Sequence, residues 1–258
     1  MRILLTNDDG VYARGIQALA SELSSLGEVI LAAPERQQSG TGHSITVFDP
    51  IRVMSTTVPG ALKAWIVSGT PVDCVKLALV RLVGKPVDLV VSGINHGANL
   101  GTDVLYSGTV SAAAEGVIMG VPAIAVSLND FGEKADFNFA ARFTRQVVQY
   151  SMEQGISKTT LLNVNIPALP GNKIKGVQVT KLGNRNYENL FEERKDPRGN
   201  SYYWMGGGVM KEEQDQESDV KLVEDGFISI TPIHLDLTDY KLIEKYKKEG
   251  QHLQNLLP

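Results

Sequence analysis

Short apolar runs alternate with stretches of helical periodicity through the first two-thirds of the chain. The apolar runs predict buried strands at residues 2–6, 29–33, 62–67, 88–92 and 123–127. Between them, apolar side chains recur every three or four residues, as at Ile16, Leu19 and Leu23, and predict amphipathic helices. Strands and helices that alternate in this way predict an α/β fold with a doubly wound, mainly parallel sheet.

Capping residues and apolar spacing place further helices. Thr70 can cap a helix that begins at Pro71, a position where the missing backbone N–H is not needed. Another helix is predicted over residues 109–119, and apolar spacing between residues 139 and 150 predicts one more. Ligands of a doubly wound sheet bind at the carboxyl ends of its strands, so candidate chemistry is expected in the loops that follow them.

The alternation ends near residue 161. Three strands without helices between them are predicted at residues 161–166, 175–182 and 226–231, and a final helix is predicted over residues 239–249. We therefore expect an α/β core, residues 1–160, and a β-rich extension, residues 161–258, within one continuous domain.

The stretch between residues 184 and 219 is long and polar, and Tyr202-Tyr203-Trp204 and Gly206-Gly207-Gly208 interrupt it. Loops of more than ~15 residues are uncommon in a compact domain unless they are functional or disordered. Two interpretations stay open: a flexible acidic excursion around residues 211–219, or a protruding β-arm whose aromatic residues pack on another subunit.

Composition and charge narrow the class of protein. Of 258 residues, 43% are apolar, 25 are Lys or Arg and 29 are Asp or Glu, which fits a folded, mildly acidic globular chain. No basic cluster is dense enough for a nucleic-acid partner. The apolar run at the N-terminus is too short for a signal-peptide core, and no ~20 apolar residues run together, so we expect a cytoplasmic protein with no membrane partner. The single cysteine, Cys74, excludes an internal disulfide and is expected in the core.

The first predicted strand runs into an acidic turn, Asn7-Asp8-Asp9-Gly10. Phosphate-binding turns at this position normally carry glycines, which let the N-terminus of a helix meet the phosphate. Two carboxylates would instead repel a phosphate. Asp, Asn and Gly are also favoured at the start of helices and in tight turns. The acidic pair therefore indicates either an ordinary turn before a helix or a cation site.

Two further loops favour the cation site. Ser39 follows the second strand and Asn95 lies just past the strand over residues 88–92, so both belong at the same sheet edge as Asp8 and Asp9. Carboxylate, hydroxyl and amide oxygens without a thiolate select a hard cation such as Mg²⁺, Mn²⁺ or Ca²⁺. Such an ion neutralises the carboxylates, attracts phosphate and can activate water.

An anion site is predicted where Ser107-Gly108-Thr109 opens the helix over residues 109–119, because the free N–H groups of a helix start attract negative charge. The same residues could instead be a plain helix cap. His43 and His96 lie in the candidate site loops and could assist proton transfer. His234 lies at a strand end in the extension, where it is either structural or completes the site.

The residues of these loops resemble the SurE family, the survival protein E nucleotidases. The resemblance rests on blocks that occur in order over most of residues 1–127: Leu4-Leu5-Thr6-Asn7-Asp8-Asp9-Gly10, Ala33-Pro34-Glu35-Arg36-Gln37-Gln38-Ser39-Gly40, Ser68-Gly69-Thr70-Pro71-Val72-Asp73-Cys74-Val75, Val91-Ser92-Gly93-Ile94-Asn95-His96-Gly97, Tyr106-Ser107-Gly108-Thr109-Val110-Ser111-Ala112-Ala113 and Gly120-Val121-Pro122-Ala123-Ile124-Ala125. The later block Ile230-Thr231-Pro232-Ile233-His234-Leu235-Asp236 is also similar, whereas residues 184–224 are the least diagnostic.

The resemblance implies a Rossmann-like core and a metal-dependent 5′/3′-nucleotidase that hydrolyses nucleoside monophosphates, and in some members short-chain polyphosphate. It implies one divalent ion per subunit, Mg²⁺ or Mn²⁺, with Ca²⁺ as a substitute in crystals. By matching motif, the ligands would be Asp8, Asp9, Ser39 and Asn95, with Asp8, Asp9 and Asn95 catalytic, and the phosphate contacts would be Ser107, Gly108 and Thr109. It further implies a homodimer or homotetramer in which a C-terminal arm is exchanged between subunits.

Two other functions compete with this one. An acidic pair after the first strand also occurs in non-catalytic, Mg²⁺-dependent receiver-like switches, but a receiver needs a phosphorylatable Asp where Asn95 stands. A nucleotide-sugar transferase would need a larger acceptor-binding domain than the last hundred residues offer.

Overall fold

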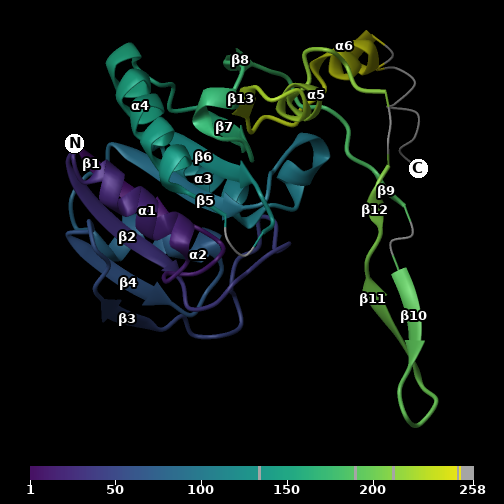
Figure 1. Ribbon diagram of the computed structural model, residues 1–258, viewed down its shortest axis with the longest axis horizontal. Coiled ribbons are helices and arrows are strands. Elements are labelled where there is room, and N and C mark those ends of the chain that lie inside the picture. Colours follow the sequence, from purple (N-terminus) through teal and green to yellow (C-terminus); the bar gives the residue numbers. More distant parts are fainter. Residues whose placement is uncertain (133–134, 189–190, 211–212, 249, 251–258) are drawn as a thin grey trace.

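A nine-stranded sheet forms the centre of the computed structural model, in the order β3-β4-β2-β1-β5-β6-β7-β13-β8 (Figure 1). The structure describes residues 1–132, 135–188, 191–210, 213–248 and 250, so residue 249 of the last predicted helix and His252 lie outside the described residues. The strands are β1 (Arg2–Thr6), β2 (Glu28–Pro34), β3 (Val53–Thr56), β4 (Lys63–Val67), β5 (Leu89–His96), β6 (Ala123–Asn129), β7 (Thr160–Pro167), β8 (Val177–Val179) and β13 (Ile228–His234).

The strands from β4 through β2, β1, β5 and β6 to β7 are all parallel, which confirms the predicted doubly wound, mainly parallel sheet. β3 pairs antiparallel with β4 at one edge, and β13 pairs antiparallel with β7 toward the other. β8 then continues parallel to β13, so strands of the predicted extension complete the sheet of the core.

Helices cover both faces of the sheet (Figure 1). α1 and α4 pack on one face, whose apolar core includes Ile16 and Val148, and α2 and α3 pack on the other, whose core includes Cys74 and Ala113. Because parallel strands are buried on both faces, they read as continuous apolar runs in the sequence. The helices are α1 (Arg14–Leu23), α2 (Pro71–Leu77), α3 (Gly108–Ile118), α4 (Asn138–Gln154), α5 (Asp219–Glu224) and α6 (Tyr240–Lys248).

The predicted cap of α2 is confirmed. The Thr70 hydroxyl accepts the N–H of Asp73 at 3.1 Å, and the Asp73 carboxylate accepts the N–H of Thr70 at 2.9 Å, which forms a capping box. The helical stretch continues past Leu77 as a π-helical turn, Ala78–Leu82, which is wider than α-helical.

Other elements differ from the prediction. β5 does not end at Ser92 but runs through a bulge to His96, so Asn95 lies inside the strand rather than just past it. The bulge needs a glycine at position 93, because a Cβ there would lie 2.4 Å from the carbonyl oxygen of Val126. β3 and α5 were not predicted, and the strand predicted over residues 175–182 is shortened to β8.

The stretch between β8 and α5 contains a β-arm that extends away from the sheet (Figure 1). β9 (Tyr187–Glu188) pairs antiparallel with β12 (Gly208–Val209), and β10 (Phe191–Lys195) pairs antiparallel with β11 (Ser201–Met205). This stretch therefore forms antiparallel ribbons, and packing of its aromatic residues on another subunit stays a prediction. Among the described residues, none of the helices has the length and apolar character needed to span a bilayer.

Candidate active site

The acidic turn is closed by its own asparagine. The Asn7 side chain donates to the carbonyl oxygen of Gly10 at 3.0 Å and accepts the Gly10 N–H at 3.2 Å, as expected of Asn in a tight turn. The N–H of Gln38, in the loop after β2, donates to the Asp8 carbonyl oxygen at 2.7 Å. The backbone therefore joins the loops that follow β1 and β2 at the carboxyl edge of the sheet.

Asp8 lies against the start of α3. Its side chain is 4% exposed, and its Oδ1 accepts a hydrogen bond from the Thr109 hydroxyl at 2.5 Å. A Cβ added to Gly108 would lie 2.7 Å from the Asp8 Cβ and 2.8 Å from Oδ2, so only glycine permits this approach. The predicted cation side and the predicted anion side of the site therefore meet at Asp8.

Asp9 is tied to the two strands beside β1. Its Oδ2 accepts the N–H of His96 at the end of β5 at 3.1 Å, and its Oδ1 accepts from Gln37 Nε2 at 3.3 Å. The same Gln37 nitrogen donates to the Ser39 hydroxyl at 2.9 Å, which joins the loop after β2 to the acidic pair. Gln37 was not identified as a site residue from the sequence. The signal that could have identified it was its position two residues before Ser39.

Asn95 is hydrogen-bonded through its amide nitrogen near the end of β5. Its Nδ2 donates to the carbonyl oxygen of Gly97 at 2.8 Å, so the amide oxygen is the atom with which it would bind a cation. The hydrogen bond from the neighbouring His96 N–H to Asp9 fixes this end of β5 beside the acidic turn.

The electrostatics of the carboxylate pair are unfavourable in the protein alone. Burial raises the pKa of Asp8 to about 6, the negative charge of Asp9 adds to this, and the hydrogen bond from Thr109 offsets part of it. Burial also raises the pKa of Asp9, against the lowering effect of the His96 N–H. Two neighbouring acids with raised pKa values indicate a place where positive charge is missing.

The available ligand atoms suit a hard cation. Nowhere among the described residues do three or more His, Cys, Asp or Glu side chains gather as a metal cluster. A cation at the acidic pair would therefore complete its shell with the Ser39 hydroxyl, the Asn95 amide oxygen and water, a set that suits Mg²⁺ or Mn²⁺ better than zinc. The residues present fit the ion that the motifs imply.

The start of α3 carries the predicted anion contacts. The Ser107 hydroxyl accepts the N–H of Val110 at 3.1 Å as the N-cap and keeps its own O–H for a ligand. Gly108 and Thr109 form the first positions of the helix, where the positive end of the helix dipole lies. Gly108 and Thr109 therefore lie next to the Asp8 side chain, and Ser107 directly precedes them, as a phosphate bound beside a metal would require.

The three candidate histidines are placed differently. His96 lies at the site, but its Nε2 lies 3.0 Å from the Gly132 carbonyl oxygen and its contribution to Asp9 is the backbone N–H. His43 pairs with the buried Glu115 at 3.0 Å, farther along α3. His234 pairs with Thr160, the first residue of β7, at the opposite edge of the sheet. The expectation that His234 could complete the site is therefore corrected, because β13 runs antiparallel to β7.

The chain is similar to known proteins of one family. The family described as Survival protein SurE matches residues 3–189. A protein from Syntrophomonas wolfei named 5′-nucleotidase SurE is 65% identical over 100% of this chain and 97% of its own, and a protein of the same name from Heliobacterium modesticaldum is 51% identical over 95% and 90%. The crystal structure of SurE protein from Aquifex aeolicus is 42% identical, with a TM-score of 0.82, and covers 97% of this chain and 100% of its own.

The raised pKa of Asp8 predicts that its charge destabilises the metal-free protein. Because the folded-state pKa of about 6 lies above the ordinary 3.8, the stability linked to Asp8 is fully present below about pH 4 and is lost as pH rises through 6. Asp8→Asn keeps an acceptor for Thr109 and removes the charge. In EDTA we expect the free energy of unfolding of this variant, relative to that of the wild type, to rise by about 1–3 kcal/mol from pH 4 to pH 7.

The measurement is thermal or urea unfolding of both proteins across that pH range. Asp49→Asn, at an exposed position, is the control and should show no such gain. An Asp8→Asn variant whose stability relative to wild type is the same at both ends of the range would contradict the assignment of a buried, uncompensated charge.

Proposed function

The chain belongs to the survival protein SurE family and is a nucleotidase, and we propose that it hydrolyses nucleoside 5′- and 3′-monophosphates with one divalent cation per subunit. Relatives up to 65% identical over the full length carry the name 5′-nucleotidase SurE. We therefore set aside the two competing hypotheses, a receiver-like switch and a nucleotide-sugar transferase. The terminal phosphoryl group of short-chain polyphosphate fits the same proposal, because recognition centres on the phosphoryl group.

One observation carries the proposal: the Asp8 carboxylate lies in contact with both Gly108 and Thr109. A cation held by Asp8 would therefore lie beside the N-terminus of α3, and a phosphoryl group could contact both. Asp9, Ser39 and Asn95 supply further oxygen atoms around the same point. We assign Mg²⁺ or Mn²⁺ as the resident ion, with Asp8, Asp9, Ser39 and Asn95 as its ligands.

When bound, the cation supplies neutralisation of the two carboxylates, attraction for the phosphoryl oxygens and polarisation of water. The Ser107 hydroxyl and the first N–H groups of α3 orient the phosphoryl group and stabilise the charge that develops on its oxygens. Hydrogen bonds from the Thr109 hydroxyl to Asp8, and from Gln37 and the His96 N–H to Asp9, hold both carboxylates in position. Because the Asn95 amide nitrogen is engaged by the Gly97 carbonyl oxygen, its amide oxygen is the atom that would bind the cation.

The arm supports a homodimer or homotetramer. Tyr202, Tyr203 and Trp204 on β11 are 42%, 61% and 59% exposed, although aromatic side chains of this size usually find cover. Every residue of β10 and β11 is exposed, so both faces of this two-stranded ribbon are available to a second copy of the chain. We propose that exchange of the arm between subunits buries these aromatic residues.

The activity is tested by phosphate release from 5′- and 3′-nucleoside monophosphates with Mn²⁺ or Mg²⁺, and again with excess EDTA. We expect release that depends on the metal and that Asp8→Asn lowers by roughly 100-fold or more, because a metal ligand is lost while the fold is kept. Asp49→Asn should retain wild-type activity. Release that persists in EDTA, or in Asp8→Asn with metal, would refute the proposed site.

The contact between Asp8 and α3 is tested by Gly108→Ala. A methyl group 2.7 Å from the Asp8 Cβ must displace the carboxylate, so we expect Mn²⁺ affinity and kcat/KM to fall by about tenfold or more. Gly116→Ala is a matched control on the same helix, where the new Cβ would lie 2.8 Å from Val90 Cγ2, away from the site. Calorimetric Mn²⁺ titration should separate the two variants, and equal losses in both would show a general packing effect instead.

The assembly is tested by the double variant Tyr203→Ser/Trp204→Ser. We expect light scattering to show a dimer or tetramer for the wild type and a smaller species for the variant, because apolar area at the interface is lost. Tyr150→Ser removes an aromatic side chain that is 65% exposed on α4, outside the arm, and should leave the mass unchanged. A variant that keeps the wild-type mass would contradict the role of these aromatic residues.

A further inference from the structure

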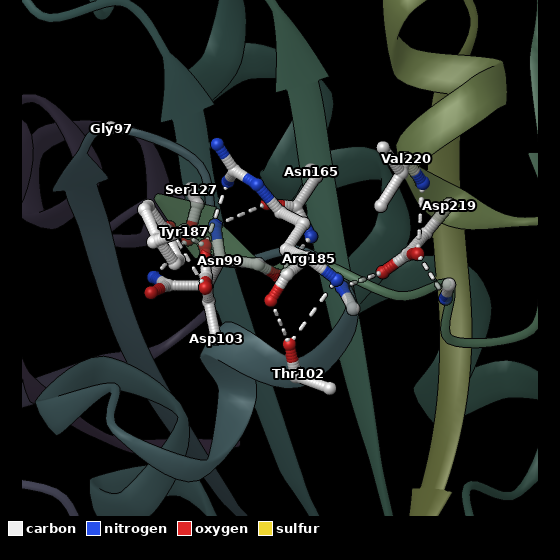
Figure 2. Close-up of polar contacts among 12 residues, drawn as sticks. Gly97, Asn99, Thr102, Asp103, Ser127, Asn165, Arg185, Tyr187, Asp219 and Val220 are labelled. Atoms are coloured by element: carbon white, nitrogen blue, oxygen red, sulfur yellow. Dashed lines mark hydrogen bonds and ion pairs between the residues drawn. The ribbon is translucent and has the colours of Figure 1, made fainter. Parts of the chain in front are cut away.

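The segment between β5 and α3 lies against the root of the arm. This segment, residues 97–107, includes a 3₁₀ turn, Gly101–Leu105, and ends at the N-cap of α3. The arm root, residues 183–187, crosses it, and Figure 2 shows Arg185 and Tyr187 beside Thr102 and Asp103. The two segments are more than 80 residues apart in the sequence, so only the fold brings them together.

The beginning of the segment is anchored to the sheet by Asn99. Its N–H donates to Asn165 Oδ1 and its Nδ2 donates to the Ser127 hydroxyl, both at 2.8 Å. Its carbonyl oxygen accepts from the side chains of Asn163 and Asn165 at 2.9 and 3.0 Å. Buried polar groups that satisfy one another in this way hold a segment in one position.

The 3₁₀ turn is hydrogen-bonded to backbone atoms of the arm root. The Thr102 hydroxyl donates to the Arg185 carbonyl oxygen at 2.6 Å and accepts the Arg185 N–H at 3.2 Å. Asp219 joins the same two segments from α5, because its carboxylate accepts the N–H of Gly101 at 2.9 Å and of Gly183 at 2.8 Å (Figure 2).

The side chain of Asp103 is held entirely by the arm root. Arg185 Nη1 donates to its Oδ2 at 2.8 Å, and the Tyr187 hydroxyl lies 2.9 and 2.8 Å from its two oxygens. The Arg185 and Asp103 side chains are only 16% and 17% exposed. A charge-assisted contact with this little exposure is much stronger than a surface ion pair.

The backbone of Asp103 in turn sets the start of α3. Its carbonyl oxygen accepts the N–H of Tyr106 at 3.0 Å and of Ser107 at 3.1 Å. Ser107 caps the helix whose next residues, Gly108 and Thr109, lie against Asp8. A continuous chain of contacts therefore leads from the arm root to the proposed phosphate contacts.

We infer that Arg185 and Tyr187 are positioning residues, which hold Asp103 and through it the Ser107-Gly108-Thr109 turn in the geometry that binds the phosphoryl group. The inference rests on the proposed function of that turn. A turn that is ordered before the phosphoryl group arrives loses less conformational entropy on binding. Whatever fixes the arm, including a second copy of the chain, would then raise the affinity for phosphate.

The test is Arg185→Gln, measured by the inhibition constant of inorganic phosphate and, separately, by calorimetric Mn²⁺ titration. We expect phosphate to bind about tenfold more weakly, since small displacements of a positioning group have effects of this size, while the Mn²⁺ affinity changes at most about twofold. Tyr187→Phe should show a smaller loss of the same kind. Arg185→Lys should recover part of the phosphate affinity, because an ammonium can still donate to Asp103.

Arg2→Gln is the matched control. The Arg2 side chain is 18% exposed, close to the value for Arg185, and it pairs at 2.6 Å with Glu28, which is 49% exposed, at the opposite edge of the sheet. Equal losses of phosphate affinity in Arg185→Gln and Arg2→Gln, or a parallel loss of Mn²⁺ affinity in Arg185→Gln, would overturn the inference. Calorimetric phosphate titration of the Mn²⁺-loaded wild type and Arg185→Gln separates this result from the proposed function, because it reports binding even if no nucleotide is hydrolysed.

Discussion

The burial of the Asp8 carboxylate against the start of α3, with Asp9 beside it, is the constraint on which the site depends. Burying a charge without a counter-charge is costly, and the hydrogen bond from Thr109 offsets only part of that cost. A divalent cation would remove this cost, since it would neutralise both carboxylates at once. The same carboxylate whose charge is costly in the metal-free chain is therefore the group that we propose as a ligand of the cation, a common relation between stability and function.

The rest of the molecule keeps this arrangement rigid. Parallel strands buried on both faces bring the loops after β1, β2 and β5 to one edge, and the bulge in β5 carries Asn95 to its place within the strand. Hydrogen bonds from Gln37 and from the His96 N–H hold Asp9, and the Asn99 network holds the segment that leads to α3. Buried backbone and hydrogen-bonded amides form this scaffold, so the site itself needs few residues.

Local chemistry could be read from the sequence where it depends on neighbours in the chain. Apolar runs predicted the core strands, Thr70 and Pro71 predicted a helix start, and the acidic turn with Ser39 and Asn95 predicted a cation site at one sheet edge. β3 and α5 escaped prediction because they are short and their stability comes from contacts with β4 and with β13, not from their own periodicity. His234 was considered for the site because residue spacing does not reveal the direction of a strand. The antiparallel direction of β13 places His234 at the far edge of the sheet.

The sequence by itself determined the α/β alternation and the family to which the chain belongs, and it supplied the oxygen-rich ligand set that we propose, because each is a property of short contiguous segments. Tertiary structure alone decided that Asp8 touches Gly108, that Gln37 bridges Asp9 and Ser39, and that Arg185 holds Asp103. These contacts join segments that lie tens of residues apart, and their geometry depends on strand order, register and burial. The pKa of Asp8 belongs to the second group, since only burial in the folded chain raises it.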